Sequence, residues 1–266
     1  MVRSEKNQVG NRFKETEAGT DNTIVAGRNA VMEALNGNRS LNKLLVAKGD
    51  RQGSIKEIIA VAREKHLVVQ EVDVKKLDEI AKGMRHQGVV LYASPVAYVE
   101  VDDILVRAAQ LGQQPFVVLL DELEDPHNLG AILRTADAVG VHGVLIPKRR
   151  SCQLSATVAK TSAGAIEYVP VAQIGNIAQT IKYLKKQGLW VVGADMDGEK
   201  NYYDADLTGP MVMVIGSEGK GLGRLTKEQC DFIVKIPMQG KINSLNASVA
   251  GSVLLLDSLR QRLAKQ

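Results

Sequence analysis

The sequence lacks the features that mark membrane, secreted and disulfide-stabilised proteins. No apolar run approaches the ~20 residues that a membrane-spanning helix needs, and the polar first residues lack the apolar core of a signal peptide. The two cysteines, Cys152 and Cys230, are too few and too far apart for a disulfide framework or a zinc site. We therefore expect a cytoplasmic protein with reduced thiols, no metal and no membrane partner.

The sequence also lacks a large excess of one charge. It has 34 basic and 30 acidic residues, so the net charge is only +4. The excess is local. Residues 1–22 hold four of each sign, residues 23–97 hold twelve basic and eight acidic, and residues 98–266 hold eighteen of each. A polyanion such as RNA would therefore be attracted to 23–97, although an ordinary solvated face would give the same tally. The polar segment 1–22 predicts a disordered tail.

The remaining residues predict two α/β domains joined by a linker. In 23–97, helical periodicity alternates with β-rich runs such as KLLVA and GVVLYA, which predicts a small α/β domain. The segment 98–115 lacks strong strand signals and holds one helical stretch, so we expect a linker there. In 116–266, five apolar runs alternate with helices, which indicates a mostly parallel sheet covered on both faces. These runs are FVVLL, GVLIP, LWVVGA, MVMVIG and FIVKIP.

Two segments place small or polar residues directly after predicted strands, at the edge where parallel sheets bind ligands. The first, at 121–140, carries Asn128 and Arg134. By itself it is also explained by a helix cap at Asn128 and a surface ion pair of Arg134. The second, IGSEGKGLGRL at 215–225, fits neither a P-loop nor a dinucleotide loop. Its glycines allow the backbone to approach a ligand closely, or they form a plain turn.

A third segment, at 236–257, holds four polar residues just before an apolar helix: Asn243, Ser244, Asn246 and Ser248. A helix needs only one N-cap residue. The surplus indicates that this segment also meets an anion or the edge of a cofactor.

Together the three segments resemble the motifs of the SpoU, or TrmH-type, subfamily of SPOUT RNA 2′-O-ribose methyltransferases. The first matches an N-x-G-x-x-x-R pattern, the second a strand with a G-x-E-G-x-G loop, and the third the I-P-M and S-L-N elements, in the expected order. The matching positions are Asn128, Gly130 and Arg134, then Gly216, Glu218, Gly219 and Gly221, and then Ile236, Pro237, Met238, Ser244, Leu245 and Asn246.

The amino-terminal segment carries a further resemblance. VAGRNAVMEALN, KLLVAKG and HQGVVLYAS resemble the substrate-binding domain of RlmB-type bacterial 23S rRNA guanosine 2′-O-methyltransferases. The resemblance implies an RNA-binding domain of L30e/L7Ae-like ribosomal-protein fold over 23–97 and a trefoil-knotted SPOUT methyltransferase domain over 116–266. It further implies S-adenosyl-L-methionine as cofactor, 23S ribosomal RNA as partner, and a homodimer.

The resemblance also implies the roles of single residues. The cofactor is expected to contact Gly216, Ile236 and Leu245, largely through backbone. The implied catalytic residues are Arg134, Asn128, Glu218, Ser244 and Asn246. The family account makes the arginine a base, but a guanidinium with a pKa above ~12 normally stays protonated. We therefore interpret it as a group that clamps a substrate phosphate and polarises the ribose 2′-hydroxyl, oriented by the other four.

The leading hypothesis is thus methylation of a guanosine ribose in 23S rRNA, with two alternatives open. A tRNA ribose 2′-O-methyltransferase would share the three motifs but usually lacks the amino-terminal domain. A non-catalytic RNA-binding ribosome-assembly factor would have a vestigial cofactor site. The motif residues are intact, which argues against this alternative: Arg134, Glu218, Ser244 and Asn246. As another proton acceptor, only His127 lies near a motif position.

Overall fold

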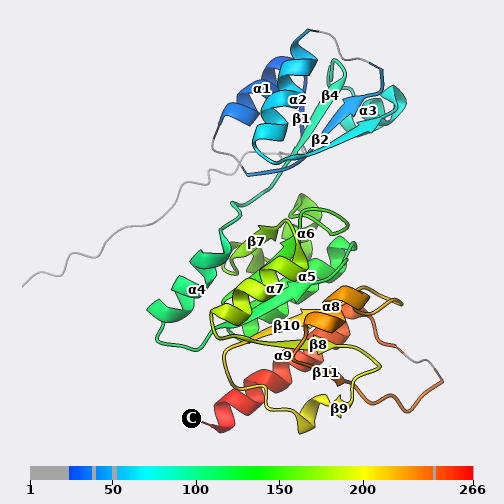
Figure 1. Cartoon of the computed structure of the whole chain (residues 1–266). Helices are drawn as coiled ribbons and strands as arrows, with labels where there is room; N and C mark the ends of the chain where they lie inside the picture. The colour runs from blue at the N-terminus through cyan, green and yellow to red at the C-terminus, as the bar shows by residue number, and fades with distance from the viewer. Residues whose placement is uncertain (1–23, 38–39, 50–52, 242–243, 266) are drawn as a thin grey trace, which may run out of the picture.

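The structure is a computed structural model that describes residues 24–37, 40–49, 53–241 and 244–265, and it contains two β-sheets that follow one another along the chain (Figure 1). The predicted tail, 1–22, and Asn243 lie outside the described residues. Within the described ranges, no helix combines the length and apolar character needed to cross a membrane. The cytoplasmic location stays a prediction.

The first sheet has four strands in the order β1-β4-β2-β3, with β2 and β3 parallel and β4 antiparallel to β1 and β2. Leu44 packs with α1 and α2 on one face, whereas its neighbour Leu45 packs with α3 on the other, as the alternation of a strand requires. Both faces are covered, which explains the continuous apolar run in β2. The elements are β1 (Ile24–Ala26), α1 (Arg28–Asn36), β2 (Leu41–Ala47), α2 (Ser54–Glu64), β3 (Val68–Val72), α3 (Val74–Ala81) and β4 (Val89–Ala93).

The second sheet has seven strands in the order β7-β6-β5-β10-β8-β11-β9, and all of its paired strands run parallel. Helices α5, α6 and α9 cover one face, and α4 and α7 cover the other. The predicted parallel sheet covered on both faces is confirmed. The elements are α4 (Val101–Gln110), β5 (Phe116–Leu120), α5 (Pro126–Ala138), β6 (Gly143–Pro147), α6 (Ala156–Thr161), β7 (Val171–Ile174), α7 (Ile177–Lys186), β8 (Trp190–Ala194), β9 (Lys200–Asn201), β10 (Met211–Ile215), α8 (Arg224–Gln229), β11 (Phe232–Lys235) and α9 (Ala247–Ala264).

The order of these strands positions the site. From β5 the chain adds β6 and β7 in one direction, and it then places β8 on the other side with β10 inserted between β5 and β8. Ligands of parallel sheets bind beyond the carboxyl ends of the strands where the direction of strand addition reverses. The loops after β5, β8 and β10 therefore lie where the fold is expected to bind a ligand. The trefoil knot that the resemblance implies stays a prediction.

The predicted linker, 98–115, contains α4, which packs onto the second sheet. Ile104 of α4 is 1% exposed, and a Cβ added to Gly143 of β6 would lie only 2.4 Å from it. Just before α4, Val99 forms an isolated parallel bridge with Ala172 of β7. This part of the segment therefore belongs to the core of the second domain.

A hydrogen-bond network fixes how the two domains meet. The Tyr98 hydroxyl donates to Asn42 Oδ1 (2.7 Å) and accepts from Leu154 N (2.9 Å), while Asn42 Nδ2 donates to the Leu154 carbonyl oxygen (2.7 Å). Asn42 lies in β2, and Leu154 lies between β6 and α6. Burial raises the pKa of Tyr98, so the phenol stays neutral and remains a donor. The three residues satisfy one another only when the domains dock in this position.

Candidate functional site

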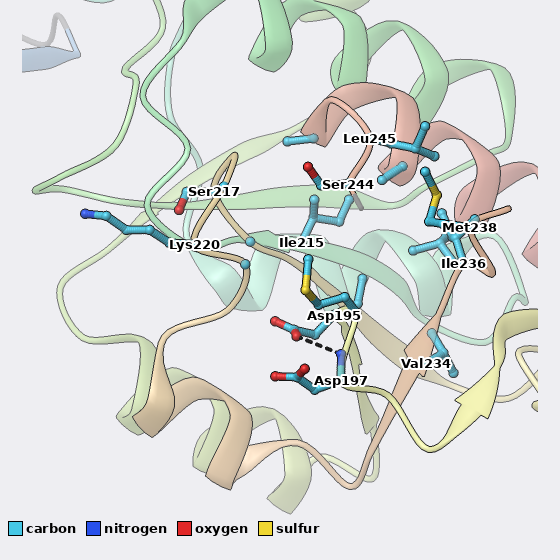
Figure 2. Close-up of a pocket in the computed structure, with 18 of the residues that line it drawn as sticks. Asp195, Asp197, Ile215, Ser217, Lys220, Val234, Ile236, Met238, Ser244 and Leu245 are labelled. Atoms are coloured by element: carbon cyan, nitrogen blue, oxygen red, sulfur yellow. Dashed lines mark hydrogen bonds between the residues drawn. The ribbon is translucent and has the colours of Figure 1, made fainter. Parts of the chain in front are cut away.

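A pocket of about 180 Å³ opens beyond the carboxyl ends of β8, β10 and β11 (Figure 2). The structure brings together all three residues predicted to bind cofactor, because Gly216, Ile236 and Leu245 line this one pocket. Ser244, expected near the ribose, lines it as well. Figure 2 shows Ile236 and Met238 on one side of the space and the loop after β10 on the other. The pocket lies at the edge that the strand order indicates.

The loop after β10, residues 216–223, has a tight backbone fold of its own. Ser217 and Gly221 exchange two backbone hydrogen bonds of 3.1 Å. Gly221 has a φ of +63°, in the region that favours glycine. A Cβ on Gly216 would lie 2.3 Å from backbone atoms of Gly221. The glycine at 216 is therefore required by the packing of the loop itself, whereas the sequence left open close approach to a ligand and a plain turn.

A buried carboxylate from the neighbouring strand anchors this loop. Asp195 directly follows β8, and its side chain is 2% exposed. It accepts a hydrogen bond from Leu222 N (2.9 Å) and pairs with Lys227 Nζ (2.8 Å), and a Cβ on Gly221 would lie 2.4 Å from it. Burial alone would raise the pKa of Asp195, but hydrogen bonds from Lys227, Leu222 N and Asp197 N hold the pKa below its ordinary value.

A second carboxylate anchors the far end of the loop. Asp121 directly follows β5, is 4% exposed, and accepts a hydrogen bond from Gly223 N (3.0 Å). Neither anchor was expected from the sequence. The available signal was an acid placed immediately after a buried apolar run, at the point where the chain leaves the carboxyl edge of the sheet.

Beside the pocket, one residue from each of the three motifs joins a polar cluster. Asn128 Nδ2 donates to Glu218 Oε1 (2.9 Å), and Asn246 Nδ2 donates to Asn128 Oδ1 (2.9 Å) and also contacts Glu218 Oε1. Asn246 is at the same time the N-cap of α9, since its Oδ1 accepts from Ser248 N and Val249 N. The third segment thus supplies an ordinary cap and a cluster member in the same side chain.

Asn128 is not the cap of its helix. The N-cap of α5 is Asp125, whose side chain accepts from His127 N (2.8 Å), and Asn128 is the third residue of the helix, with 4% of its surface exposed. The reading of Asn128 as a helix cap is therefore wrong. Its amide is instead free to connect the other two motifs. The His127 side chain is exposed and is not part of the described lining of this pocket.

Within one chain, the structure does not bring Arg134 to the cluster. Arg134 is exposed on α5, six residues after Asn128, which places it about 9 Å further along the helix and on a different face. It is absent from the described lining of the pocket and of the cleft next to it. Its catalytic role stays a prediction.

The cleft next to the cluster is acidic. It has a volume of about 320 Å³, and besides Asn128 and Glu218 its lining includes Glu122, Glu124 and Asp125, with Lys220 as the cation. A phosphate would be repelled here unless a further positive charge arrived with the substrate or with another chain. The site of a single chain is therefore short of cations.

Neither metal nor thiol chemistry is built into the described part of the chain. It contains no group of three His, Cys, Asp or Glu side chains that could hold a metal ion. Cys152 and Cys230 are both free, and burial raises the pKa of each thiol to about 12. They remain protonated near neutral pH, and a thiolate nucleophile is not available.

Two family models together match most of the chain. The SpoU rRNA Methylase family matches residues 115–256, and RNA 2′-O ribose methyltransferase substrate binding matches residues 24–99. The chain is 49% identical over 238 residues to the putative TrmH family tRNA/rRNA methyltransferase YacO of Bacillus subtilis (strain 168), covering 90% of this chain and 95% of that protein.

Solved structures of related methyltransferases have the same architecture. The AdoMet-bound rRNA methyltransferase from Sinorhizobium meliloti is 25% identical with a TM-score of 0.57, and the match covers 90% of this chain and 87% of that one. The A. aeolicus TrmH/SpoU tRNA modifying enzyme is 29% identical with a TM-score of 0.53, and the match covers 61% of this chain and 86% of that one. The chain therefore belongs to the SpoU (TrmH) family and is an RNA 2′-O-ribose methyltransferase.

The anchoring of the loop by Asp195 gives a prediction. Asp195→Asn should lower the free energy of unfolding by about 1–3 kcal/mol at pH 7, because the buried charge-assisted hydrogen bonds are lost. The wild type should keep this advantage above the unfolded-state pKa of about 3.9 and lose it as the pH falls through the lower folded-state pKa of Asp195. Urea unfolding between pH 7 and pH 3 measures the difference.

Asp231→Asn is the matched control. Asp231 also accepts from a lysine, Lys185 Nζ (2.7 Å), and from a backbone amide, Val191 N (2.8 Å), but it lies away from the pocket. We expect both variants to be less stable, and only Asp195→Asn to weaken binding of S-adenosylmethionine, the cofactor that the resemblance implies. Equal losses of affinity in the two variants would contradict the anchoring role.

Proposed function

We propose that this enzyme transfers the methyl group of S-adenosylmethionine to the ribose 2′-hydroxyl of a guanosine in 23S ribosomal RNA. One observation carries the proposal: the pocket that gathers Gly216, Ile236 and Leu245 adjoins the cluster in which Asn128, Glu218 and the third motif meet. A donor pocket and a group of hydrogen-bonding side chains for a sugar thus lie next to each other. That is what methyl transfer to a ribose requires.

The residues of the pocket fit the cofactor. Ile215, Ile236 and Leu245 form apolar walls suited to an adenine ring, and the backbone of the Gly216 loop lies open beside them. The hydroxyls of Ser217 and Ser244 supply hydrogen-bonding groups at the rim. When bound, S-adenosylmethionine supplies an electrophilic methyl group on a sulfonium centre.

The side chains of the cluster orient the substrate. The amide groups of Asn128 and Asn246 both contact Oε1 of Glu218. Its other carboxylate oxygen, Oε2, is therefore left for a ribose hydroxyl. A hydroxyl that donates to this carboxylate is held in one orientation beside the donor pocket. We assign the polarisation of the 2′-hydroxyl and the clamping of a substrate phosphate to Arg134, whose guanidinium stays protonated. Ser244 and Asn246 position the ribose.

The extent of structural similarity supports ribosomal RNA over transfer RNA. The S. meliloti rRNA methyltransferase matches 90% of this chain, so the similarity includes the amino-terminal domain. The A. aeolicus tRNA modifying enzyme matches only 61%. The first domain also has the excess of basic residues, twelve against eight in 23–97, that an RNA-binding module needs.

Methyl mapping tests the substrate. The purified protein is incubated with labelled S-adenosylmethionine and total RNA from a strain that lacks the gene, and the labelled nucleotide is then identified. We expect label in 23S rRNA at the 2′-oxygen of one guanosine. Label confined to tRNA would establish the tRNA alternative. Binding of RNA without any label would show the non-catalytic assembly factor and contradict the proposal.

We further propose a homodimer in which Arg134 acts on the site of the other copy. Val249, Leu256 and Leu263 are 49%, 53% and 58% exposed and recur every seven residues along α9, so they form one apolar stripe on the surface. α9 lies against α5, where Thr135 and Ser252 share a hydrogen bond of 2.8 Å. Pairing of two such faces would cover the stripe and bring a second Arg134 near an acidic cleft that is short of cations.

Mixed dimers test this arrangement. Arg134→Ala and Leu245→Arg should each abolish methyl transfer, the first by removing the guanidinium and the second by filling the cofactor pocket. If the arginine acts across the interface, a mixed dimer has one complete site, and co-expression should restore about a quarter of wild-type activity. Size-exclusion chromatography verifies that both variants still dimerise. No recovery in verified mixed dimers would place Arg134 in its own chain's site.

A further inference from the structure

A second cavity, of about 160 Å³, lies between the two domains. Lys65 and His66, just after α2, line it from the first domain, and Lys148, just after β6, lines it from the second. Asn42 and Gln173 contribute amide groups. We call this cavity the interdomain cleft.

The ionisable side chains that line the interdomain cleft are all basic. Its described lining holds two lysines and a histidine and no acid. Neither Lys65 nor Lys148 forms an ion pair with another described residue, in contrast to Lys185 and Lys227, which pair with Asp231 and Asp195. Two ammonium groups that face one cavity repel each other unless an anion lies between them. An anion bound between these lysines would reduce their repulsion and so stabilise the docked arrangement of the two domains.

The amide groups of the cleft are held in place before any ligand arrives. Asn42 is 8% exposed and belongs to the network with Tyr98 and Leu154 described above. Gln173 Nε2 donates to Gln153 Oε1, and Gln153 Nε2 donates to the Pro147 carbonyl oxygen (2.8 Å). A cavity with fixed polar groups costs less entropy to fill than one whose side chains must first be ordered.

The cleft opens at the same edge of the sheet as the cofactor pocket. Lys148 directly follows β6, which is separated from β10 by β5 alone. With strands about 4.8 Å apart, the two positions differ by about 10 Å along the edge. An RNA strand whose ribose reaches the Asn128 and Glu218 cluster can therefore place a neighbouring part of its backbone at Lys148.

We propose that the interdomain cleft binds a backbone phosphate of the RNA substrate, held jointly by Lys65 and His66 of the first domain and Lys148 of the second. This inference rests on the proposed function in taking an RNA strand as the occupant of the active site. A phosphate held from both sides ties the two domains together while the methyl group is transferred. It adds affinity without reading sequence, because phosphate contacts position a nucleic acid and base contacts specify it.

The test measures RNA affinity as a function of salt for Lys65→Gln, Lys148→Gln and the double variant. The probes are a 23S rRNA transcript and a tRNA transcript, each from 50 to 300 mM KCl. Each single variant should bind both RNAs about three- to tenfold more weakly at 150 mM salt, and the slope of log affinity against log salt should become less steep by about 0.7–0.9. Because one phosphate is shared, the double variant should bind about as weakly as the weaker single variant.

Lys186→Gln is the matched control, since Lys186 is an exposed lysine at the end of α7, outside the interdomain cleft. It should leave affinity and slope unchanged, and all variants should keep their affinity for S-adenosylmethionine. Losses that multiply in the double variant would overturn the shared phosphate, and values equal to the control would overturn the site. Inorganic phosphate that stabilises the wild type but not the double variant, with RNA affinity unchanged, would assign the cleft to a free anion.

Discussion

The site depends on the anchoring of one glycine loop to two carboxylates. Residues 216–223 fold back on themselves so tightly that position 216 has no room for a side chain. Asp195 and Asp121 accept hydrogen bonds from consecutive backbone amides of this loop, at Leu222 and Gly223. Each carboxylate follows a different strand, and β10 lies between those two strands. The parallel sheet thus fixes the loop from both sides, and the loop forms a wall of the pocket that we propose for the cofactor.

The same loop connects the pocket to the polar cluster. Glu218 lies in the loop, Asn128 on α5 and Asn246 at the start of α9. Their amides and carboxylate satisfy one another, so α5 and α9 are held in register with the loop. The cap of α9 is part of this arrangement, since the oxygen of Asn246 caps the helix while its nitrogen completes the cluster. The end of α9 and the group that we propose to bind the ribose therefore depend on the same side chain.

Much of this could be predicted from the sequence, for identifiable reasons. Strands β5, β6 and β10 are buried along their whole length and have continuous apolar sequences, and the less buried β8 and β11 are apolar along most of their length. β7 was missed because the polar Gln173, which lines the interdomain cleft, interrupts its apolar sequence. β9 was missed because it has only two residues. Of the three predicted cofactor residues that share a pocket, Gly216 and Ile236 directly follow the ends of β10 and β11, and Leu245 lies just before α9.

What the sequence could not predict are relations between distant segments. An acid after a strand, such as Asp121 or Asp195, has no local pattern that tells an anchor of a loop from a solvated side chain. The pairing of Tyr98 with Asn42 depends on the docking of two domains. The position of Arg134, apart from the cluster in one chain, depends on helical phase and on the expected second copy. Such features follow from packing, which becomes visible only in three dimensions.

Amide hydrogen exchange at Leu222 and Gly223 tests most directly whether the pocket wall is formed before any ligand binds. With cofactor absent, both amides should exchange at least about a hundredfold more slowly than the amide of Gly219 at the exposed tip of the loop, since each donates to a buried carboxylate. Addition of S-adenosylmethionine should change their rates little compared with this difference. Exchange at Leu222 and Gly223 as fast as at Gly219 until the cofactor is added would contradict a loop anchored by Asp195 and Asp121.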